Sequence, residues 1–397
     1  MRVLLTSEAR FERTPDGVIW APAAYGRPLW ARYLEVFSSV LVAARVRDVH
    51  EPSPGSVEAS SATVRFCRLP PYSGLSGFVR HARKIRRIIA GVARDCPALI
   101  VRSPSPSACI TSRVAIGAER PYGAEIVGDP NQVFSPGGFS HPLRLPIRCV
   151  ATAAQTYVSR HAIAALYVTR HALQHRYPTQ GSVHAASDVA LDDLAFASGP
   201  SREWRAPAPF VIVTVGALDQ PYKGTAMLID AVSDLRKRHA PVQLRIVGEG
   251  RLKAQLQQQC RTLGTADGVE FLGQQDRCGV FAALDSAHLF VLPSLTEGLP
   301  RALLEAMARG LPAVGTAVGG VPELLGDECL VPPRQPRALA ARIEGLMADD
   351  SRRRDLGERN RQLARTYHER VQGAVRREFL HAVLDASAPA FREARCA

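Results

Sequence analysis

Two glutamates near the middle of the second half of the chain are spaced for chemistry on a phosphorylated ligand. Glu297 and Glu305 are separated by seven residues in the string HLFVLPSLTEGLPRALLEAMARGLPAVGTAVGGVPELL, residues 288–325. We expect a strand ending at Leu292 and a helix entered at Pro300, where the missing proline N–H costs nothing. The free N–H groups and positive dipole end of that helix favour a phosphate or diphosphate.

The two carboxylates need a role compatible with an anion beside them. A carboxylate next to a diphosphate is repelled unless it accepts hydrogen bonds from hydroxyls, so both glutamates are candidates to bind sugar or ribose hydroxyl groups. A second glycine-rich turn contains Gly319 and Gly320, which allow the backbone to approach a phosphate closely. The plain alternative is an ordinary strand–helix unit in which a glutamate caps the helix.

Other phosphate and metal motifs are missing from the sequence. A G-x-G-x-x-G motif fails because Lys253 stands where a third small residue belongs, and residues 223–225 reverse the order of a P-loop. D-x-D does not occur. His171 and His175 are four residues apart, but no third ligand is near, so we expect two surface histidines and no metal site.

Length and composition indicate a soluble globular protein of two domains, or of three small ones. The chain has 397 residues, of which 46% are apolar and 22% charged, with a formal charge of +13. This composition argues against disorder, collagen and coiled coil. Residues 1–200 hold 23 basic and 14 acidic residues, against 27 and 23 in residues 201–397. The first half is therefore the basic one, which attracts phosphate, nucleic acid or anionic lipid.

The cysteine pattern and the apolar runs allow a prediction of the cellular compartment. The eight cysteines are scattered without a C-x-x-C pair, which excludes a zinc or disulfide framework and predicts reduced thiols in a cytosol. The apolar run at residues 3–6 is too short for a signal peptide, and no 18-residue apolar stretch occurs. We expect a cytoplasmic protein whose membrane contact, if any, is peripheral.

Short apolar runs alternate with helical windows along most of the chain, which predicts parallel sheets covered by helices. The expected strands are residues 3–6, 40–44, 98–101, 124–127, 164–169, 210–215, 242–247, 269–272, 289–292 and 313–315. The expected helices are residues 30–38, 78–93, 105–117, 143–159, 225–239 and 251–263, and the chain beyond Pro336 is mostly helical. The polar, proline-rich residues 198–209 are the expected linker.

The string around the two glutamates resembles the E-x7-E signature of retaining glycosyltransferases of the family 4 type. The blocks at residues 305–312 (EAMARGLP) and 319–324 (GGVPEL) are equally typical, and residues 215–224 resemble the first strand and loop of the family's donor domain. Residues 247–250 and 269–273 match further family loops. The resemblance is strong over 209–345 and weaker over 1–200.

The resemblance implies the GT-B fold, an α/β architecture of two doubly wound, Rossmann-like parallel-sheet domains facing a central cleft. Residues 1–200 would form the acceptor-side domain. Residues 201–397 would form the donor domain, which binds the nucleotide sugar, with a helical C-terminal tail that packs back on the first domain.

The same resemblance implies roles for individual residues. Glu297 would contact the donor sugar and Glu305 the ribose hydroxyls. Lys223, with backbone N–H groups near Leu299 and Arg301, would neutralise the leaving diphosphate. The other implied donor-binding positions are Gly216, Gly298, Gly319 and Gly320. The resemblance also implies that no metal or cofactor would be required and that the nucleotide-diphosphate sugar would be a co-substrate.

The sequence departs from the family's pattern at two places, position 217 and the helix entry at residues 298–300. At the helix entry, Gly-Leu-Pro replaces the commoner Gly-Phe-Gly, so Pro300 removes one N–H donor from the phosphate site. Ala217 stands where the family has an arginine, and Arg301 or Arg27 are the candidates to replace it. Asp129 follows a strand where the family places a polar residue against the transferred sugar, so it is our third catalytic candidate; the alternative is a turn aspartate. Tyr25, Gly26 and Arg27 form a candidate acceptor or donor loop, or a plain surface loop.

Residues 78–92 (FVRHARKIRRIIAGV) predict a basic amphipathic helix that either docks on anionic lipid or packs on a sheet with a solvated basic face. With only 6% aromatic residues and no RNA-module signature, we expect no nucleic-acid partner.

The sequence thus predicts a metal-independent, retaining hexosyltransferase. Its acceptor would be a saccharide or a lipid-linked molecule, in cell-surface polysaccharide or glycolipid biosynthesis. The alternatives are a nucleotide-sugar epimerase or hydrolase on the same fold, or a non-catalytic nucleotide-sugar-binding protein.

Overall fold

The computed structural model describes residues 1–134, 143–189, 191–196 and 209–396. The chain divides into two compact units. The first unit is Met1–Pro130, Cys149–Ala186 and Gly373–Ala397, and the second is Asn131–Arg148 and Ser187–Gln372. Residues 187–196 therefore group with the second unit and the end of the chain with the first. The linker expected over 198–209 lies, apart from its last residue, outside the described residues.

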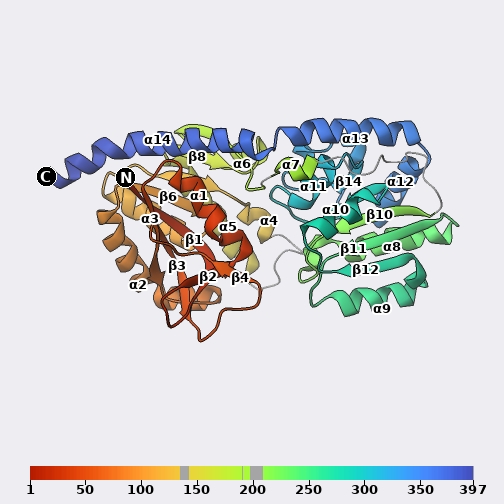
Figure 1. Ribbon diagram of the computed structural model, residues 1–397, viewed down its shortest axis with the longest axis horizontal. Coiled ribbons are helices and arrows are strands. Elements are labelled where there is room, and N and C mark those ends of the chain that lie inside the picture. The colour runs from red at the N-terminus through yellow and green to blue at the C-terminus, as the bar shows by residue number, and fades with distance from the viewer. Residues whose placement is uncertain (135–142, 190, 197–208, 397) are drawn as a thin grey trace. The chain divides into compact units, whose positions relative to one another are not determined.

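The first unit is built on a mixed sheet (Figure 1). Its parallel part has the order β5-β3-β1-β6-β7-β8-β9, and the short antiparallel strands β2 and β4 extend it from the end of β1. The bounds are β1 Arg2–Arg13, β2 Ile19–Pro22, β3 Ser39–Asp48, β4 Ser56–Glu58, β5 Val64–Leu69, β6 Ala98–Ser103, β7 Gly123–Ile126, β8 Ala164–Tyr167 and β9 Ser182–Ala185.

Alternating side chains of this sheet enter two separate cores. Val3 and Leu5 of β1 join one core, and Leu4 joins the other, as the two-residue period of a strand requires. The first core includes residues of α1 and α14, and the second includes residues of α2, α3 and α5. The helix bounds are α1 Arg27–Leu34, α2 Gly74–Asp95, α3 Pro106–Gly117, α4 Pro130–Val133, α5 Arg144–Arg160, α6 Ala172–Arg176 and α14 Glu369–Cys396, with a 3-10 turn η1 at Ala23–Tyr25.

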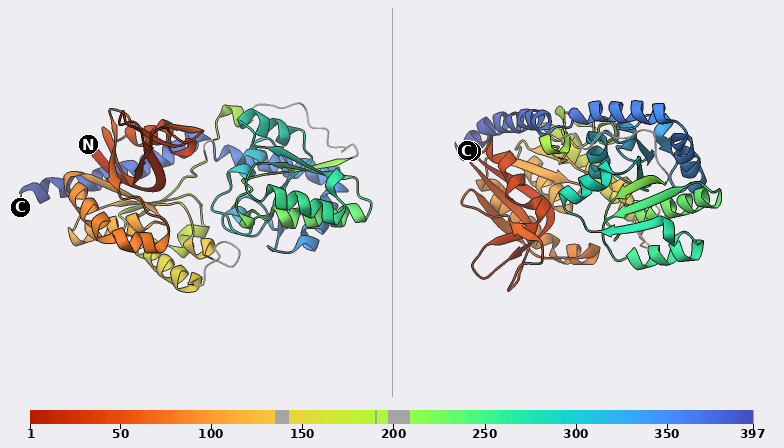
Figure 2. Two further views of the ribbon diagram at one scale, coloured as in Figure 1. Left: turned by 90° about the horizontal axis from the view of Figure 1, so that it is seen from below. Right: turned by 45° about the vertical axis from the view of Figure 1, so that its right-hand side comes forward.

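The second unit has an all-parallel sheet of order β12-β11-β10-β13-β14-β15. Helices α8, α9 and α12 pack together, and α10, α11 and α13 form a second group (Figures 1 and 2). The strands are β10 Phe210–Val215, β11 Val242–Val247, β12 Val269–Gly273, β13 Leu289–Leu292, β14 Ala313–Thr316 and β15 Leu330–Val331. The helices are α7 Asp193–Phe196, α8 Thr225–Lys237, α9 Lys253–Leu263, α10 Arg277–Asp285, α11 Arg301–Ala308, α12 Pro336–Met347 and α13 Asp350–Arg365, with 3-10 turns η2 Pro221–Lys223, η3 Ala266–Gly268, η4 Val321–Glu323 and η5 Asp327–Cys329.

The predicted α/β class with parallel sheets is confirmed. Strands β10, β11 and β13 have the predicted bounds. β10 and β13 are buried, mostly apolar runs, as expected of strands covered on both faces, whereas β11 alternates buried apolar residues with the half-buried Gln243 and Arg245. Strand β5 was not predicted, since its sequence VRFCRL places two arginines in an edge strand and reads as polar. Strands β2 and β4 have only four and three residues and give no periodic signal.

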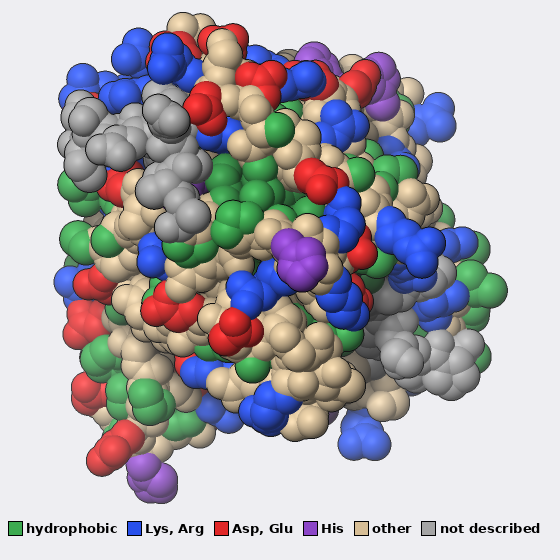
Figure 3. All heavy atoms as spheres, turned by 90° about the vertical axis from the view of Figure 1, so that its right-hand side faces the viewer, with side chains coloured by type: hydrophobic (Ala, Val, Ile, Leu, Met, Phe, Trp, Pro, Cys, Tyr) green, Lys and Arg blue, Asp and Glu red, His purple; other side chains and the backbone are tan. Residues whose placement is uncertain are grey.

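The surface shows both signs of charge. Viewed from the end that carries α8 and α12, acidic and basic side chains are interspersed with apolar ones (Figure 3). Among the helices that the structure describes, none is long and apolar enough to cross a bilayer.

Candidate functional site

The loops that follow the strands of the second unit pack closely against one another at glycine residues. Gly224 has φ +71°, and a Cβ there would lie 1.9 Å from the backbone oxygen of Pro293, so the loop after β10 lies directly on the end of β13. A Cβ on Gly319 would lie 1.8 Å from the oxygen of Glu297, and the N–H of Gly320 donates to the oxygen of Gly298 at 2.8 Å. The turn after β14 therefore also contacts the segment that carries Glu297. Backbone positions this tight accept no side chain.

This arrangement brings Lys223 and Glu297 into contact. The Lys223 Nζ lies 2.8 Å from the Glu297 Oε1, and the Ser294 hydroxyl donates to the same oxygen at 2.7 Å. The carboxylate is 8% exposed and the lysine side chain 29% exposed. The sequence therefore identified two charged residues, 74 positions apart, that the fold places in one ion pair. A nearly buried carboxylate with such partners is an anion held in a fixed position.

The helix that follows begins one residue later than the sequence predicted. Arg301 is the first residue of α11, and Pro300 is its N-cap, with φ −77° and ψ 114°. Pro300 has no side-chain capping group, so the first N–H groups of α11 have no capping side chain. The helix ends at Ala308, and Gly310 follows with φ +66°. Arg301 is exposed at the positive end of this helix.

Glu305 lies on α11, one turn beyond Arg301. Burial raises the pKa of its carboxyl group, while the positive charges of Arg301 and Arg277 lower that pKa in part. Arg277 is itself held by a two-pronged ion pair with Asp192, and its guanidinium lies 5.2 Å from the ring centroid of Phe281. Glu305 is thus a half-buried carboxylate near two arginines and an available acceptor of hydrogen bonds.

The raised pKa of Glu305 predicts a pH dependence of stability. A carboxyl whose folded pKa exceeds its unfolded pKa stabilises the fold below the unfolded pKa, and this contribution is lost as pH rises through the folded pKa. As pH rises from below 4.5, the ordinary carboxyl value, the wild type loses this contribution and Glu305→Gln does not. We therefore expect the free energy of unfolding of Glu305→Gln to increase relative to that of the wild type. Urea unfolding of both proteins across the acid range measures it; parallel curves would contradict the prediction.

The remaining predicted donor positions are Gly216, in the loop after β10, and Leu299. Gly216 follows β10, and its N–H donates to the backbone oxygen of Val247 at 3.0 Å. A Cβ on Gly248 would lie 2.0 Å from the backbone oxygen of Gly216. Ala217 is exposed, and its methyl side chain supplies no positive charge at the position where the family has an arginine. Leu299 is half-buried against the core of the second unit. That these residues contact the donor stays a prediction.

Four predicted residues of the first half, Tyr25, Gly26, Arg27 and Asp129, belong to the first unit. Asp129 is buried and accepts a hydrogen bond from the Tyr177 hydroxyl at 2.5 Å, and it forms an ion pair with Arg176. These partners give Asp129 a structural role, and its catalytic role stays a prediction. Tyr25 packs edge-on against Phe11, with ring centroids 6.2 Å apart.

Gly26 and Arg27 lie where η1 meets α1. Gly26 is the buried N-cap of α1, and Arg27 forms an ion pair with Glu58. Arg27 was one of the two arginines predicted to replace the missing cation at position 217. The other, Arg301, lies in the same unit as Lys223 and has no hydrogen-bond or ion-pair partner among the described residues.

Sequence reasoning missed Ser294 and Arg277. Ser294 lies in the quoted string three residues before Glu297, so its proximity to that glutamate was a readable signal. No signal in the sequence pointed to Arg277, because its approach to Glu305 depends on how α10 packs beside α11. Among the residues that the structure describes, no group of three or more His, Cys, Asp or Glu is placed to hold a metal ion.

Comparison with known proteins now gives the site a family context. Residues 209–349 match the family described as "Glycosyl transferases group 1". These residues form a group 1 glycosyltransferase domain. It contains Lys223, Ser294, Glu297 and Glu305. The chain is 35% identical over 177 residues to the Escherichia coli (strain K12) protein named for colanic acid biosynthesis, the glycosyltransferase WcaL; the match covers 42% of this chain and 43% of WcaL.

Solved structures extend the likeness to the whole fold. The sucrose-phosphate synthase of Thermosynechococcus elongatus superposes with a TM-score of 0.71 at 17% identity, over 97% of this chain and all of that one. Anabaena HepE, solved in complex with UDP-glucose, gives a TM-score of 0.66 at 18% identity, over 97% of this chain and all of HepE. The predicted GT-B fold is confirmed, with the group 1 glycosyltransferase domain as its second half.

Proposed function

We propose that this protein is a retaining glycosyltransferase that takes a sugar from a nucleotide-diphosphate sugar. The observation that carries the proposal is the Lys223–Glu297 ion pair next to the uncapped start of α11, inside a group 1 glycosyltransferase domain. The name of WcaL supports a role in cell-surface polysaccharide or glycolipid biosynthesis, with a saccharide or lipid-linked acceptor. The complex of HepE with UDP-glucose supports a nucleotide-sugar donor.

The proposed chemistry follows from where charge develops. Cleavage of the bond between the anomeric carbon and the phosphate oxygen gives the leaving diphosphate a negative charge and the carbon a positive one. The Lys223 ammonium and the first N–H groups of α11 stabilise the leaving group, because fixed donors need no reorganisation. Arg301 adds a second cation in place of the arginine missing at position 217.

The two glutamates orient the donor in this proposal. Glu297, fixed by Ser294, accepts hydrogen bonds from hydroxyls of the transferred sugar, and Glu305 accepts them from the ribose. Neither attacks the anomeric carbon, so we propose retention in which the acceptor hydroxyl arrives on the face that the diphosphate leaves. Since the cations that the mechanism needs are side chains, we propose that transfer requires no metal.

A ligand-binding and product experiment tests this function. Thermal unfolding is followed with UDP, GDP, ADP and TDP and their common sugar conjugates, in the presence of EDTA. One diphosphate at 100 times its Kd stabilises the protein by about 2.7 kcal/mol. Slow hydrolysis of the matching donor is then followed by NMR, and we expect the released sugar to keep the donor's anomeric configuration. Absence of any shift, or an inverted sugar, contradicts the proposal.

We further propose that α2 brings the protein to the cytoplasmic face of an anionic membrane. Ile85 and Ile89 of α2 are buried in the first unit, whereas Val79 is 65% exposed. Six basic side chains of α2 are exposed and form no ion pair with the described residues, and residues 74–94 contain no Asp or Glu. These six are Arg80, Arg83, Lys84, Arg86, Arg87 and Arg94. A basic face of this kind matches anionic headgroups, at about 1 kcal/mol per basic residue.

Vesicle sedimentation measures this association. We expect binding to vesicles of phosphatidylglycerol but not of phosphatidylcholine, weakening as salt rises. The double variant Arg83→Glu, Arg87→Glu should lower the bound fraction at least about tenfold. The matched control Arg352→Glu, Arg354→Glu reverses two exposed arginines of α13 and should bind as the wild type does. Equal binding by both variants would contradict a role for α2.

A further inference from the structure

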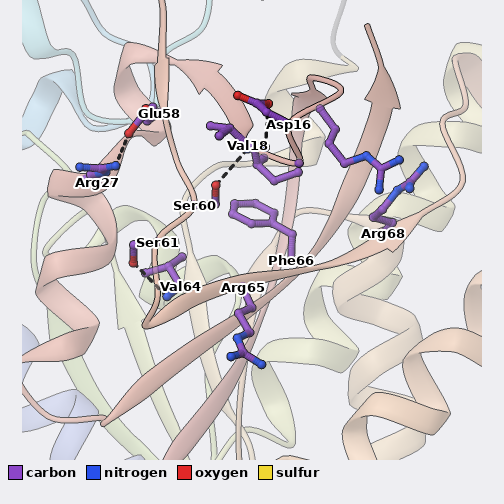
Figure 4. A pocket seen from close by; sticks show the side chains of 13 residues that line it. Asp16, Val18, Arg27, Glu58, Ser60, Ser61, Val64, Arg65, Phe66 and Arg68 are labelled. Carbon is purple, nitrogen blue, oxygen red and sulfur yellow. Dashed lines mark hydrogen bonds and ion pairs between the residues drawn. The ribbon is translucent and has the colours of Figure 1, made fainter.

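Two charged residues that the sequence offered in the first half of the chain, Arg27 and Asp129, are engaged in ion pairs. Arg27 lines a pocket of about 520 Å³ in the first unit, where its guanidinium pairs with the carboxylate of Glu58 (Figure 4). Asp129 accepts a hydrogen bond from the Tyr177 hydroxyl at Oδ1, and its Oδ2 pairs with Arg176. Both side chains therefore have partners within the first unit.

Gln132, three residues beyond Asp129, lies with the second unit instead. The segment Asn131–Arg148 groups with that unit, although it belongs to the first half of the chain. The Oε1 of Gln132 accepts a hydrogen bond from the Thr296 hydroxyl at 3.2 Å, across 164 positions of sequence. Thr296 is buried and directly precedes Glu297. The side chain of Gln132 is therefore held beside the segment that carries the proposed sugar-binding carboxylate.

The amide of Gln132 retains its donors. Its only hydrogen bond to a described residue is the one that Oε1 accepts, so the N–H groups of Nε2 are available to a ligand. The side chain is half-buried, so part of it is open to solvent. Glu297 has a complementary free group: Ser294 and Lys223 both bind its Oε1, and its Oε2 forms no hydrogen bond with the described residues.

An amide N–H and a free carboxylate oxygen together suit the hydroxyl groups of a sugar. A hydroxyl both donates and accepts hydrogen bonds, so full recognition needs both kinds of partner. A carboxylate only accepts, and Gln132 therefore supplies the donor that Glu297 lacks. A site built to bond a hydroxyl discriminates strongly against a sugar without it, because the polar groups of the site then stay unpaired.

We propose that Gln132 is a specificity-determining residue for the transferred sugar. Its Nε2 donates a hydrogen bond to the oxygen of one sugar hydroxyl, while its Oε1 keeps the bond from Thr296. Selection of the donor then depends on a residue of the first half of the chain as well as on the group 1 domain, residues 209–349. This role rests on the proposed function, because it requires a nucleotide-sugar donor at Glu297.

Calorimetric titration of the full-length protein measures this role. UDP, GDP, ADP and TDP are titrated, each beside its glucose, galactose and mannose conjugates, and in the wild type we expect one conjugate to bind more tightly than its diphosphate. Gln132→Met keeps the side-chain length and loses the amide. It should lower the affinity for that conjugate at least about fivefold and leave the affinity for the diphosphate within about twofold. Gln362→Met, at an exposed position of α13, is the matched control and should bind both as the wild type does.

Deoxy analogues separate a contact with the sugar from a structural role. Analogues of the bound conjugate, each lacking one sugar hydroxyl, are titrated against the wild type and Gln132→Met. Loss of the hydroxyl that Gln132 binds should weaken binding to the wild type and leave binding to the variant unchanged. Thr296→Val removes the bond between the two side chains and keeps the amide, so it should retain the dependence on that hydroxyl. A purely structural tether predicts instead that Thr296→Val matches Gln132→Met.

Three results would overturn this role while the proposed function stands: no conjugate that binds better than its diphosphate, wild-type affinity of Gln132→Met for the conjugate, or equal losses in both proteins for every missing hydroxyl. If none of the diphosphates binds the wild type, the proposed function fails and this role fails with it. Thermal unfolding shows whether Gln132→Met is folded, and Gln132→Ala replaces it in the titrations if it is not.

Discussion

Replacing Lys223 with alanine is expected to lower kcat/KM for sugar transfer at least about 100-fold, or about 2.7 kcal/mol of transition-state stabilisation. The ammonium group is the cation next to α11 and would neutralise the departing diphosphate. We also expect a nucleoside diphosphate to bind Lys223→Ala more weakly, because the same charge attracts the product. Steady-state kinetics and calorimetric titration measure the two effects.

Lys237→Ala is the matched control, since Lys237 is exposed on α8 and forms no ion pair with the described residues. It should stay within about twofold of the wild type. Thermal unfolding of Lys223→Ala separates a catalytic loss from a folding defect, because the variant leaves Glu297 nearly buried without its cation. Wild-type kinetics in a folded Lys223→Ala would contradict the assignment.

Replacing Glu297 with alanine should produce the opposite pattern in binding. Transfer should again fall at least about 100-fold, because the sugar loses the carboxylate that orients it. The nucleoside diphosphate, however, should bind as tightly as in the wild type or more tightly. In the free protein the Lys223 ammonium is paired with Glu297, and removal of the carboxylate frees that ammonium for the phosphates.

The comparison of a diphosphate with its sugar conjugate makes this prediction sharp. In the wild type the conjugate should gain affinity from hydroxyl contacts with Glu297, and in Glu297→Ala that gain should disappear. Asp355→Ala, which removes an exposed carboxylate of α13, should leave both ligands unchanged. If Glu297→Ala weakens the diphosphate and its conjugate equally, Glu297 contacts the nucleotide instead of the sugar.

The second unit could be predicted from sequence more fully than the first. Its strands β10 and β13 are buried, mostly apolar runs, and β11 has buried apolar residues on alternate positions. The string that carries Glu297 and Glu305 marks the start and end of its helix with Pro300 and Gly310. The contact between Lys223 and Glu297 could be expected only because the resemblance placed both on the same donor, Lys223 at its diphosphate and Glu297 at its sugar.

What escaped prediction depends on contacts between distant parts of the chain. The arginines of β5 conceal a strand, because an edge strand tolerates charge on its open side. The contacts of Asp129 with Tyr177 and Arg176 were not predicted either, because these partners lie 48 and 47 residues further along the chain.

The glycine contacts of the second unit limit how such an enzyme can be re-engineered. Gly224 touches the backbone at Pro293, Gly319 touches it at Glu297, and Gly248 touches it at Gly216, so each loop takes its shape from its neighbour. A loop transplanted alone from a relative with another donor preference would meet partners shaped for the original. Donor preference should therefore transfer between relatives only when the loops after β10, β11, β13 and β14 are exchanged as a set.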